Sequence, residues 1–162
     1  MIAVLESPLA ARRSFTPWLS VVVPVFNERD NVAPLLHEIT AWLRWQTPSD
    51  GGDFEIIYVD DSSRDDTIAV LQSLRHEIPE LRVIRHELQY GQSTAIRTGV
   101  EAAHGQWIVT LDGDGQYDPA DIPRLLAVRA SAAEDVKLFA GWRVNRQDSD
   151  SKRLASRFAN AI

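Results

Sequence analysis

The chain has 162 residues, of which 44% are hydrophobic and 25% charged, so it has the size of one domain and can bury a core of its own. A formal net charge of −6 excludes the basic surface that general nucleic-acid binding requires, and we expect no nucleic-acid partner. The lack of cysteine excludes a disulfide framework and thiolate chemistry, and the longest apolar run, residues 18–26, is too short to span a membrane.

The first predicted elements are a leader, a strand and a helix. Residues 1–17 have no apolar stretch after their two arginines, so we interpret them as a loose leader rather than a signal peptide. Residues 19–26 are a β-branched run that predicts a buried strand of a parallel sheet, and Pro24, which cannot donate a ladder hydrogen bond, marks its end. Apolar residues at helical spacing from Val32 to Leu43 predict a helix, with Pro34 in its first turn.

The same strand-then-helix plan repeats along the chain. Further strands are predicted at residues 54–59, 81–85, 106–111 and 136–140, and further helices at about 67–78, 95–103, 121–130 and 151–162. Gly105 is expected at the C-cap of the helix before it. This alternation predicts an α/β fold with a doubly wound, mostly parallel sheet and helices on both faces. Ligands bind such sheets beyond the carboxyl ends of the strands, at the switch point of the strand order.

The segment after the predicted strand 106–111 is the centre of the predicted site. Alternate side chains of an extended segment share a face, so Asp112, Asp114 and Gln116 can point together. Three hard oxygen ligands suit Mg²⁺ or Mn²⁺ and leave coordination positions for a substrate phosphate. An EF-hand loop is excluded because its sixth and twelfth positions would be Tyr117 and Pro123. An ordinary acidic turn that caps the next helix stays open as the alternative.

Two other acidic clusters are expected at the same edge of the sheet, at residues 24–28 and at Asp60-Asp61. Such a convergence of carboxylates requires a cation or hydrogen-bond donors to compensate it. The sequence contains neither the glycine-rich dinucleotide fingerprint after its first strand nor a Walker-type phosphate loop. A bound metal would therefore carry the phosphates. Residues 141–162 hold five Lys or Arg against two Asp, which suggests that this end meets an anionic partner.

Five blocks, in order, resemble the inverting family 2 glycosyltransferases. They are Val-Pro-Val-Phe-Asn-Glu at 23–28, Val-Asp-Asp-Ser-Ser at 59–63, Gly-Gln-Ser-Thr-Ala-Ile-Arg-Thr-Gly at 91–99, Asp-Gly-Asp-Gly-Gln at 112–116 and Gly-Trp-Arg at 141–143. Within the family they are similar to dolichol-phosphate mannose synthases and bacterial undecaprenyl-phosphate glycosyltransferases. The resemblance implies a GT-A fold over residues 18–162 and a GDP-mannose or UDP-sugar donor. It also implies a polyprenyl phosphate acceptor and a cytoplasmic place at the inner face of a membrane.

The resemblance also implies roles for single residues. The donor would be held by Pro24, Phe26, Glu28, Asp60, Asp61, Asp112 and Gly113, with the metal on Asp112, Asp114 and Gln116. Asp114 and Arg143 would be catalytic, and Arg143, Arg146 and Arg157 would meet the acceptor phosphate. Because full-length members continue further, the chain looks like a fragment whose GT-A domain is incomplete at its C-terminal end. We expect it to bind nucleotide and metal but to transfer sugar poorly or not at all.

The acceptor chemistry fits this assignment, although other readings stay open. A phosphomonoester with a second pKa of about 6 is largely ionised at neutral pH, so it needs cations to position it more than it needs a general base. Arg143 could instead be a surface ion-pair residue, and residues 151–162 could be a membrane-surface helix or a core helix. The four histidines are expected to be surface or packing residues. The alternative functions are transfer to a saccharide hydroxyl, which would need a general base, and a non-catalytic nucleotide-binding module.

Overall fold

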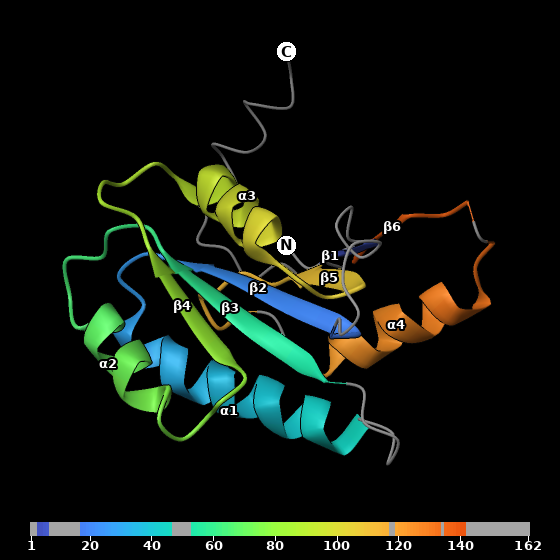
Figure 1. The fold of residues 1–162 in the computed structure, drawn as a ribbon, viewed down its shortest axis with the longest axis horizontal. Coiled ribbons are helices and arrows are strands. Elements are labelled where there is room, and N and C mark those ends of the chain that lie inside the picture. Colours follow the sequence, from blue (N-terminus) through green and yellow to red (C-terminus); the bar gives the residue numbers. More distant parts are fainter. Residues whose placement is uncertain (1–2, 7–16, 47–52, 117–118, 134, 142–162) are drawn as a thin grey trace, which may run out of the picture.

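The computed structural model describes residues 3–6, 17–46, 53–116, 119–133 and 135–141. Its described part contains one six-stranded sheet in the order β4-β3-β2-β5-β1-β6 (Figure 1). The strands are β1 (Ala3–Glu6), β2 (Leu19–Val25), β3 (Phe54–Asp60), β4 (Leu81–Arg85), β5 (Trp107–Thr110) and β6 (Leu138–Ala140). The helices are α1 (Arg29–Gln46), α2 (Thr67–Leu74), α3 (Gln92–Ala102) and α4 (Asp121–Ser131). None of the helices in this part of the chain has both the length and the apolar character needed to cross a bilayer.

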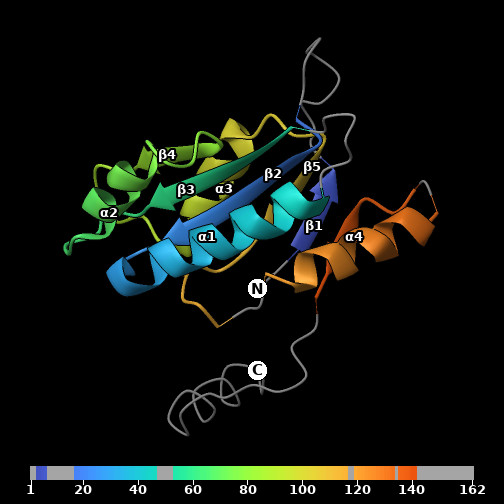
Figure 2. The same ribbon diagram turned by 90° about the horizontal axis from the view of Figure 1, so that it is seen from below.

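The four neighbouring strands β4, β3, β2 and β5 are parallel, which confirms the predicted doubly wound, mostly parallel sheet. Alternate residues of each strand face opposite sides and feed two cores. One core joins the sheet to α1, α2 and α4 and contains Tyr58 and Leu36, and the other joins it to α3 and contains Val22 and Ala95. Figure 1 shows α3 on one face of the sheet with α1 and α2 on the other, and Figure 2 looks onto the side of α1 and α4. Helices therefore cover both faces.

The N-terminal segment differs from the sequence-based expectation. Ala3–Glu6, which lie in the predicted loose leader, form β1 and pair antiparallel with both β5 and β6. An unpaired edge of β5 would leave a row of backbone N–H and C=O groups without partners, and β1 supplies those partners. A four-residue strand on its own carries too little pattern to be recognised. The last predicted strand is also shorter, since β6 begins at Leu138 rather than at 136.

Two local expectations about the helices are wrong. Pro34 lies beyond the first turn of α1, because the helix already begins at Arg29 and the Glu28 carbonyl accepts its first hydrogen bonds from Asn31 N and Val32 N. Gly105 is not the C-cap of α3, a position that Ala103 takes. Gly105 instead packs against β2, where an added Cβ would lie 2.5 Å from the backbone nitrogen of Ser20. This glycine is needed for close packing rather than for capping.

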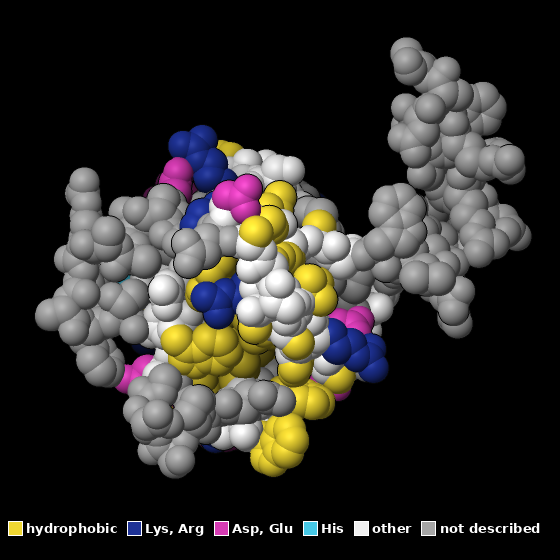
Figure 3. All heavy atoms as spheres, turned by 90° about the vertical axis from the view of Figure 1, so that its right-hand side faces the viewer, with side chains coloured by type: hydrophobic (Ala, Val, Ile, Leu, Met, Phe, Trp, Pro, Cys, Tyr) yellow, Lys and Arg dark blue, Asp and Glu magenta, His cyan; other side chains and the backbone are white. Residues whose placement is uncertain are grey.

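The sheet has a polar end and an apolar end. At the amino end of β2, an apolar groove of about 240 Å³ lies between α1 and α4 and is lined by Trp18, Trp42, Leu43, Ile122, Pro123, Leu126 and Ala127. Figure 3 views the molecule from the side of α4 and shows hydrophobic side chains gathered there. The polar motifs that follow β2, β3 and β5 lie at the opposite end of the sheet, at the carboxyl ends of these strands.

Candidate functional site

A cleft of about 380 Å³ lies at the carboxyl ends of the central strands. Strand order reverses between β2 and β5, because the chain moves outward from β2 to β4 and then returns through α3 to β5. The cleft therefore lies at the switch point where an open α/β sheet binds its ligands. Its lining is Pro24, Val25, Phe26, Glu28, Asp61, Gln89, Gly91, Gln92, Ala95, Asp112, Gly113 and Asp114. The structure thus brings seven of the predicted site residues to one cleft, namely Pro24, Phe26, Glu28, Asp61, Asp112, Gly113 and Asp114.

The segment after β5 is held against the end of β2 by a glycine. A Cβ added to Gly113 would lie 2.4 Å from Val25 Cγ1 and 2.9 Å from the Pro24 carbonyl oxygen, so only glycine allows this approach. With Gly113 packed inward, the flanking Asp112 and Asp114 both line the cleft. Gly113 lines the cleft as well, and the segment beyond β5 is a turn, so the strand-like alternation expected from the sequence stays a prediction.

Two glutamines hold these carboxylates. Gln92 Nε2, at the start of α3, donates to Asp112 Oδ1 at 2.7 Å, and the backbone nitrogen of Gln116 donates to Asp114 Oδ1 at 3.0 Å. The side chain of Gln116 is exposed and is not part of the cleft lining, so its predicted role as a metal ligand stays a prediction. Sequence reasoning missed the contact of Gln92, which depends on α3 returning beside β5.

Glu28 reaches the cleft from the loop that precedes α1. Its backbone nitrogen donates to Thr67 Oγ1 at 2.9 Å, and its Oε2 accepts a hydrogen bond of 2.6 Å from Asn31 Nδ2. Gly115, which has a φ of +68°, lies beside the same asparagine, since an added Cβ would be 3.4 Å from Asn31 Oδ1. Asn31 therefore lies between the Glu28 loop and the loop after β5, a position that its place in the sequence did not reveal.

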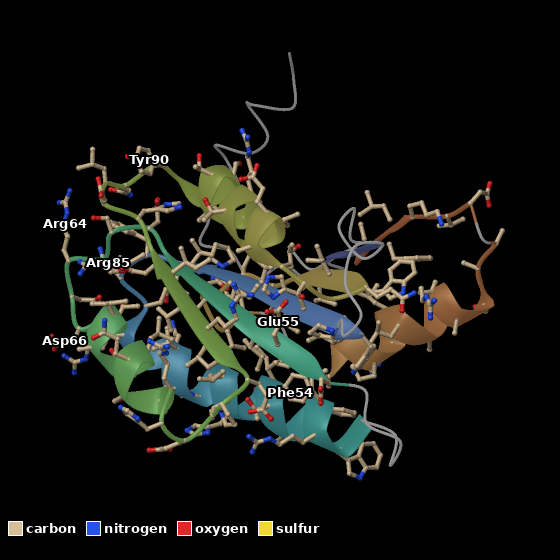
Figure 4. The ribbon with its side chains drawn as sticks, in the orientation of Figure 1. Phe54, Glu55, Arg64, Asp66, Arg85 and Tyr90 are labelled. Atoms are coloured by element: carbon tan, nitrogen blue, oxygen red, sulfur yellow. The ribbon has the colours of Figure 1, made fainter. Side chains whose placement is uncertain are left out.

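The neighbouring residues Asp60 and Asp61 have different positions. Asp60 is fully buried, accepts hydrogen bonds from Ser63 N at 3.2 and 3.3 Å, and pairs with Arg85 Nε at 3.3 Å. It is not part of the cleft lining, so the structure does not place it where the predicted donor contact requires. Figure 4 shows Arg85 at the carboxyl end of β4, beside the loop that follows β3. We interpret Asp60 as the residue that holds this loop.

Asp61 is the carboxylate after β3 that faces the cleft. Its Oδ1 lies 2.7 Å from His86 Nδ1 and accepts from Tyr90 N at 2.9 Å, and its Oδ2 accepts from Gly91 N at 2.6 Å. Burial alone would raise the pKa of Asp61, but the hydrogen bonds from His86, Tyr90 N and Gly91 N outweigh it and lower the pKa. Asp61 is therefore ionised at neutral pH.

His86 is an integral part of this arrangement and not a surface residue. Its side chain is 9% exposed, and its second ring nitrogen, Nε2, lies 2.9 Å from Thr98 Oγ1 on α3. The ring also packs edge-on against Tyr90, with 5.3 Å between the ring centroids. His86 is thus a packing residue, as one of the two expectations for the histidines has it, and both of its ring nitrogens also have polar partners, which the sequence did not indicate.

In the described part of the chain, the two non-glycine residues with positive φ lie in loops that border the cleft. Asn27 and Ser62, just beyond β2 and β3, have φ values of +57° and +65°, which non-glycine residues rarely adopt. The loops are joined by hydrogen bonds of 2.8 Å from Asn27 N to Ser63 Oγ and from Arg64 N to Asn27 Oδ1. These bonds between loops keep Phe26 and Glu28 beside Asp61 in spite of the strained conformations.

The lining of the cleft fits a hard divalent cation. Asp112 and Asp114 flank a glycine and offer carboxylate oxygens, the ligands that Mg²⁺ and Mn²⁺ prefer. Within the described ranges no group of three or more His, Cys, Asp or Glu side chains is placed to hold a metal. A cation on these two aspartates would have coordination positions left for water, for a bound phosphate and for Gln116, the predicted third ligand. The predicted phosphate-binding residues Arg143, Arg146 and Arg157 lie outside the described residues.

Comparison with known proteins relates the chain to one family. The family model described as "Glycosyl transferase family 2" matches residues 20–159. A dodecaprenyl-phosphate galacturonate synthase of Rhizobium johnstonii is 37% identical over 136 residues, covering 80% of this chain and 37% of that protein. An undecaprenyl-phosphate 4-deoxy-4-formamido-L-arabinose transferase of Sodalis glossinidius is 38% identical over 146 residues, covering 89% of this chain and 42% of that protein. The chain thus spans less than half the length of these relatives.

A solved structure supports the fold. A mannosyltransferase from Pyrobaculum calidifontis in complex with GDP-Man and Mn²⁺ superimposes with a TM-score of 0.53 at 24% sequence identity. The match covers 67% of this chain and 29% of that one. At this identity the likeness concerns the fold, and it agrees with the α/β sheet and switch-point cleft described above.

Proposed function

The chain belongs to glycosyl transferase family 2 and has its GT-A fold, and from this premise we propose that it transfers a sugar from a nucleotide-sugar donor to a polyprenyl phosphate. The names of two relatives, a dodecaprenyl-phosphate synthase and an undecaprenyl-phosphate transferase, support the acceptor class. A lipid phosphate of this kind would be met at the cytoplasmic face of a membrane.

One observation carries the proposal, which is that Asp112 and Asp114 line the same cleft as Glu28 and Asp61 at the switch point of the sheet. Asp112 and Asp114 would hold Mg²⁺ or Mn²⁺, which when bound neutralises the charge of the departing nucleoside diphosphate. Gln92 fixes the Asp112 carboxylate by its 2.7 Å hydrogen bond. The two aspartates therefore need little reorganisation before a diphosphate binds.

The nucleoside would lie on the other side of the cleft. Pro24 and Phe26 offer apolar surface for a base or ribose, and Asp61 offers an ionised acceptor for a base N–H. We assign this contact to Asp61 rather than to Asp60, because the Asp60 carboxylate is buried and bonded to Ser63 N and Arg85. An anionic side chain repels phosphate, so the diphosphate belongs at the metal and the base belongs at Asp61.

The acceptor side is assigned by chemistry and by resemblance. An ionised phosphate oxygen attacks the anomeric carbon without losing a proton, so no residue has to act as a general base. Cations are needed instead to bring two anions together, and the predicted ones are Arg143, Arg146 and Arg157. Among them Arg143 would be the residue that acts beside Asp114 in the reaction.

Calorimetric titration of UDP and GDP tests the donor site. We expect Mn²⁺ to tighten the binding of at least one nucleotide by about tenfold or more, the scale of one charge-assisted contact. Asp114→Ala should abolish this metal effect, whereas the control Asp53→Ala, an exposed aspartate just before β3, should keep it. Nucleotide binding that is equally tight without metal would favour a non-catalytic module.

A further inference from the structure

The cleft carboxylate Asp61 has most of its acceptor capacity already in use. An ionised carboxylate offers about four lone-pair positions, two on each oxygen. Among the described residues, His86 Nδ1 and Tyr90 N use both positions on Oδ1, whereas Gly91 N is the one donor to Oδ2. One acceptor position remains for a ligand, and it is on Oδ2.

The two candidate bases differ in how many acceptors they require. Guanine presents two adjacent donors, its ring N1–H and its exocyclic amino group, which match both oxygens of one carboxylate. Uracil presents a single imide N–H between two carbonyl groups. A carboxylate with one open position can satisfy uracil, but it would leave one guanine donor buried without a partner, which weakens binding.

We propose that His86 determines the base specificity of the donor site: by occupying Oδ1 of Asp61 it leaves a single acceptor position, which selects uridine nucleotides over guanosine nucleotides. This inference rests on the proposed function, because it requires a nucleotide base to reach Asp61. His86 does not touch the base and acts through the carboxylate.

The surroundings of His86 fix its ring in this role. Because an ionised carboxylate can only accept, the proton between His86 and Asp61 belongs to Nδ1, and Thr98 Oγ1 holds the other ring nitrogen at 2.9 Å. The backbone nitrogen of His86 donates to the Asp60 carbonyl at 2.9 Å, and the ring packs against Tyr90. Of the three donors to Asp61, His86 is the one that a substitution can remove, since the other two are backbone groups.

The test compares the dissociation constants of UDP and GDP, each with Mn²⁺, for the 162-residue chain and its variants. The unsubstituted chain should bind UDP about tenfold or more tightly than GDP, the scale of one unpaired buried donor. His86→Phe keeps a ring but removes the donor, so this ratio should fall severalfold toward one. His86→Asn can still donate to Oδ1 and should keep the ratio, and the control His37→Leu, an exposed residue of α1, should not change it.

The outcomes separate this inference from the proposed function. Equal or tighter binding of GDP by the unsubstituted chain would overturn the inference and leave a nucleotide-sugar transferase intact. A His86→Phe chain that loses affinity for both nucleotides equally would show that His86 is only structural. If His86→Phe does not fold, Thr98→Val, which removes the hydroxyl behind the ring, should lower the ratio in the same direction, and an unchanged ratio would count against His86. Binding of neither nucleotide would overturn the proposed function together with the inference.

Discussion

Replacing Glu55 by glutamine should destabilise the protein without changing its cleft. Glu55 is the second residue of β3 and is 6% exposed, and Figure 4 shows it far along the strand from the end where Arg85 lies. Its Oε1 accepts from Ser20 Oγ at 2.7 Å and from His104 N at 2.5 Å, and its Oε2 is bonded by the Arg82 guanidinium. A glutamine side chain has only one acceptor oxygen, so its amino group would face at least one of these donors.

The size of the stability loss depends on which of the donors to Glu55 can be hydrated after the substitution. Breaking a fully buried ion pair costs about 3–5 kcal/mol. The side chain of Arg82 is 38% exposed and can be hydrated, which lowers that figure, whereas Ser20 is fully buried and its hydroxyl cannot. We therefore expect a loss of about 2–3 kcal/mol in the free energy of unfolding. At about 2–4 °C per kcal/mol for a domain of this size, the melting temperature should fall by about 4–12 °C.

Urea and thermal denaturation of Glu55→Gln beside Glu101→Gln measure this effect. Glu101 pairs with Arg97 on the surface of α3, and such exposed pairs contribute little to stability. Burial alone would raise the pKa of Glu55, but hydrogen bonds from Ser20, Arg82 and His104 N lower it overall. The stabilisation is thus complete above the unfolded pKa of about 4.3 and is lost as the pH falls through the lower folded value. The difference in the free energy of unfolding between the wild type and Glu55→Gln should therefore become smaller below about pH 4. A difference that grows in acid would refute this reasoning. So would a loss of stability no larger than that of Glu101→Gln.

Two further substitutions separate loop support from ligand contact at the carboxyl end. Asp60→Asn should weaken the bonds to Ser63 N and Arg85 and lower the free energy of unfolding by about 1–3 kcal/mol. Urea denaturation measures this effect, and an unchanged midpoint would argue against a role of Asp60 in holding the loop after β3. Gly113→Ala should weaken the binding of UDP with Mn²⁺ by about tenfold, because the new methyl group would lie 2.4 Å from Val25 Cγ1 and displace the flanking carboxylates. Calorimetry measures this affinity, and a value equal to that of the wild type would show that the loop adapts to the methyl group.

The sheet and the location of the cleft could both be predicted from the type and order of the elements. Buried strands of a parallel sheet are continuous β-branched runs, and the polar residues that follow them must gather at one edge. That argument brings residues 24–28 together with Asp112 and Asp114, although they are far apart in the chain, and the structure confirms the convergence. It needs only the type and order of the elements.

The same argument cannot distinguish Asp60 from Asp61. Adjacent residues of a strand face opposite sides, so one aspartate must be turned inward when the other faces the cleft. Which is which depends on the register of β3 between its neighbours, where Asp60 is paired with Val25 on β2 and with Arg85 on β4. A pair of identical residues carries no information about that register.

Residues that support the carboxylates were missed for a related reason. Gln92, Asn31 and His86 act on groups that other elements supply, so their roles depend on the strand order and on which face α3 covers. The strand β1 was missed because its four residues are stabilised by the exposed edge of β5 and not by any pattern of their own.

A comparison of Glu55 and Asp61 shows why one carboxylate next to β3 serves the fold and the other can serve a ligand. Both are buried, both accept three hydrogen bonds, and both have pKa values lowered by those bonds in spite of burial. The difference is what surrounds the second carboxylate oxygen. At Glu55 the second oxygen lies 3.6 Å from His104 Nδ1 in addition to Arg82, so the protein itself surrounds it. At Asp61 the carboxylate forms part of the cleft wall, so its remaining position can accept a hydrogen bond from a ligand that enters the cleft.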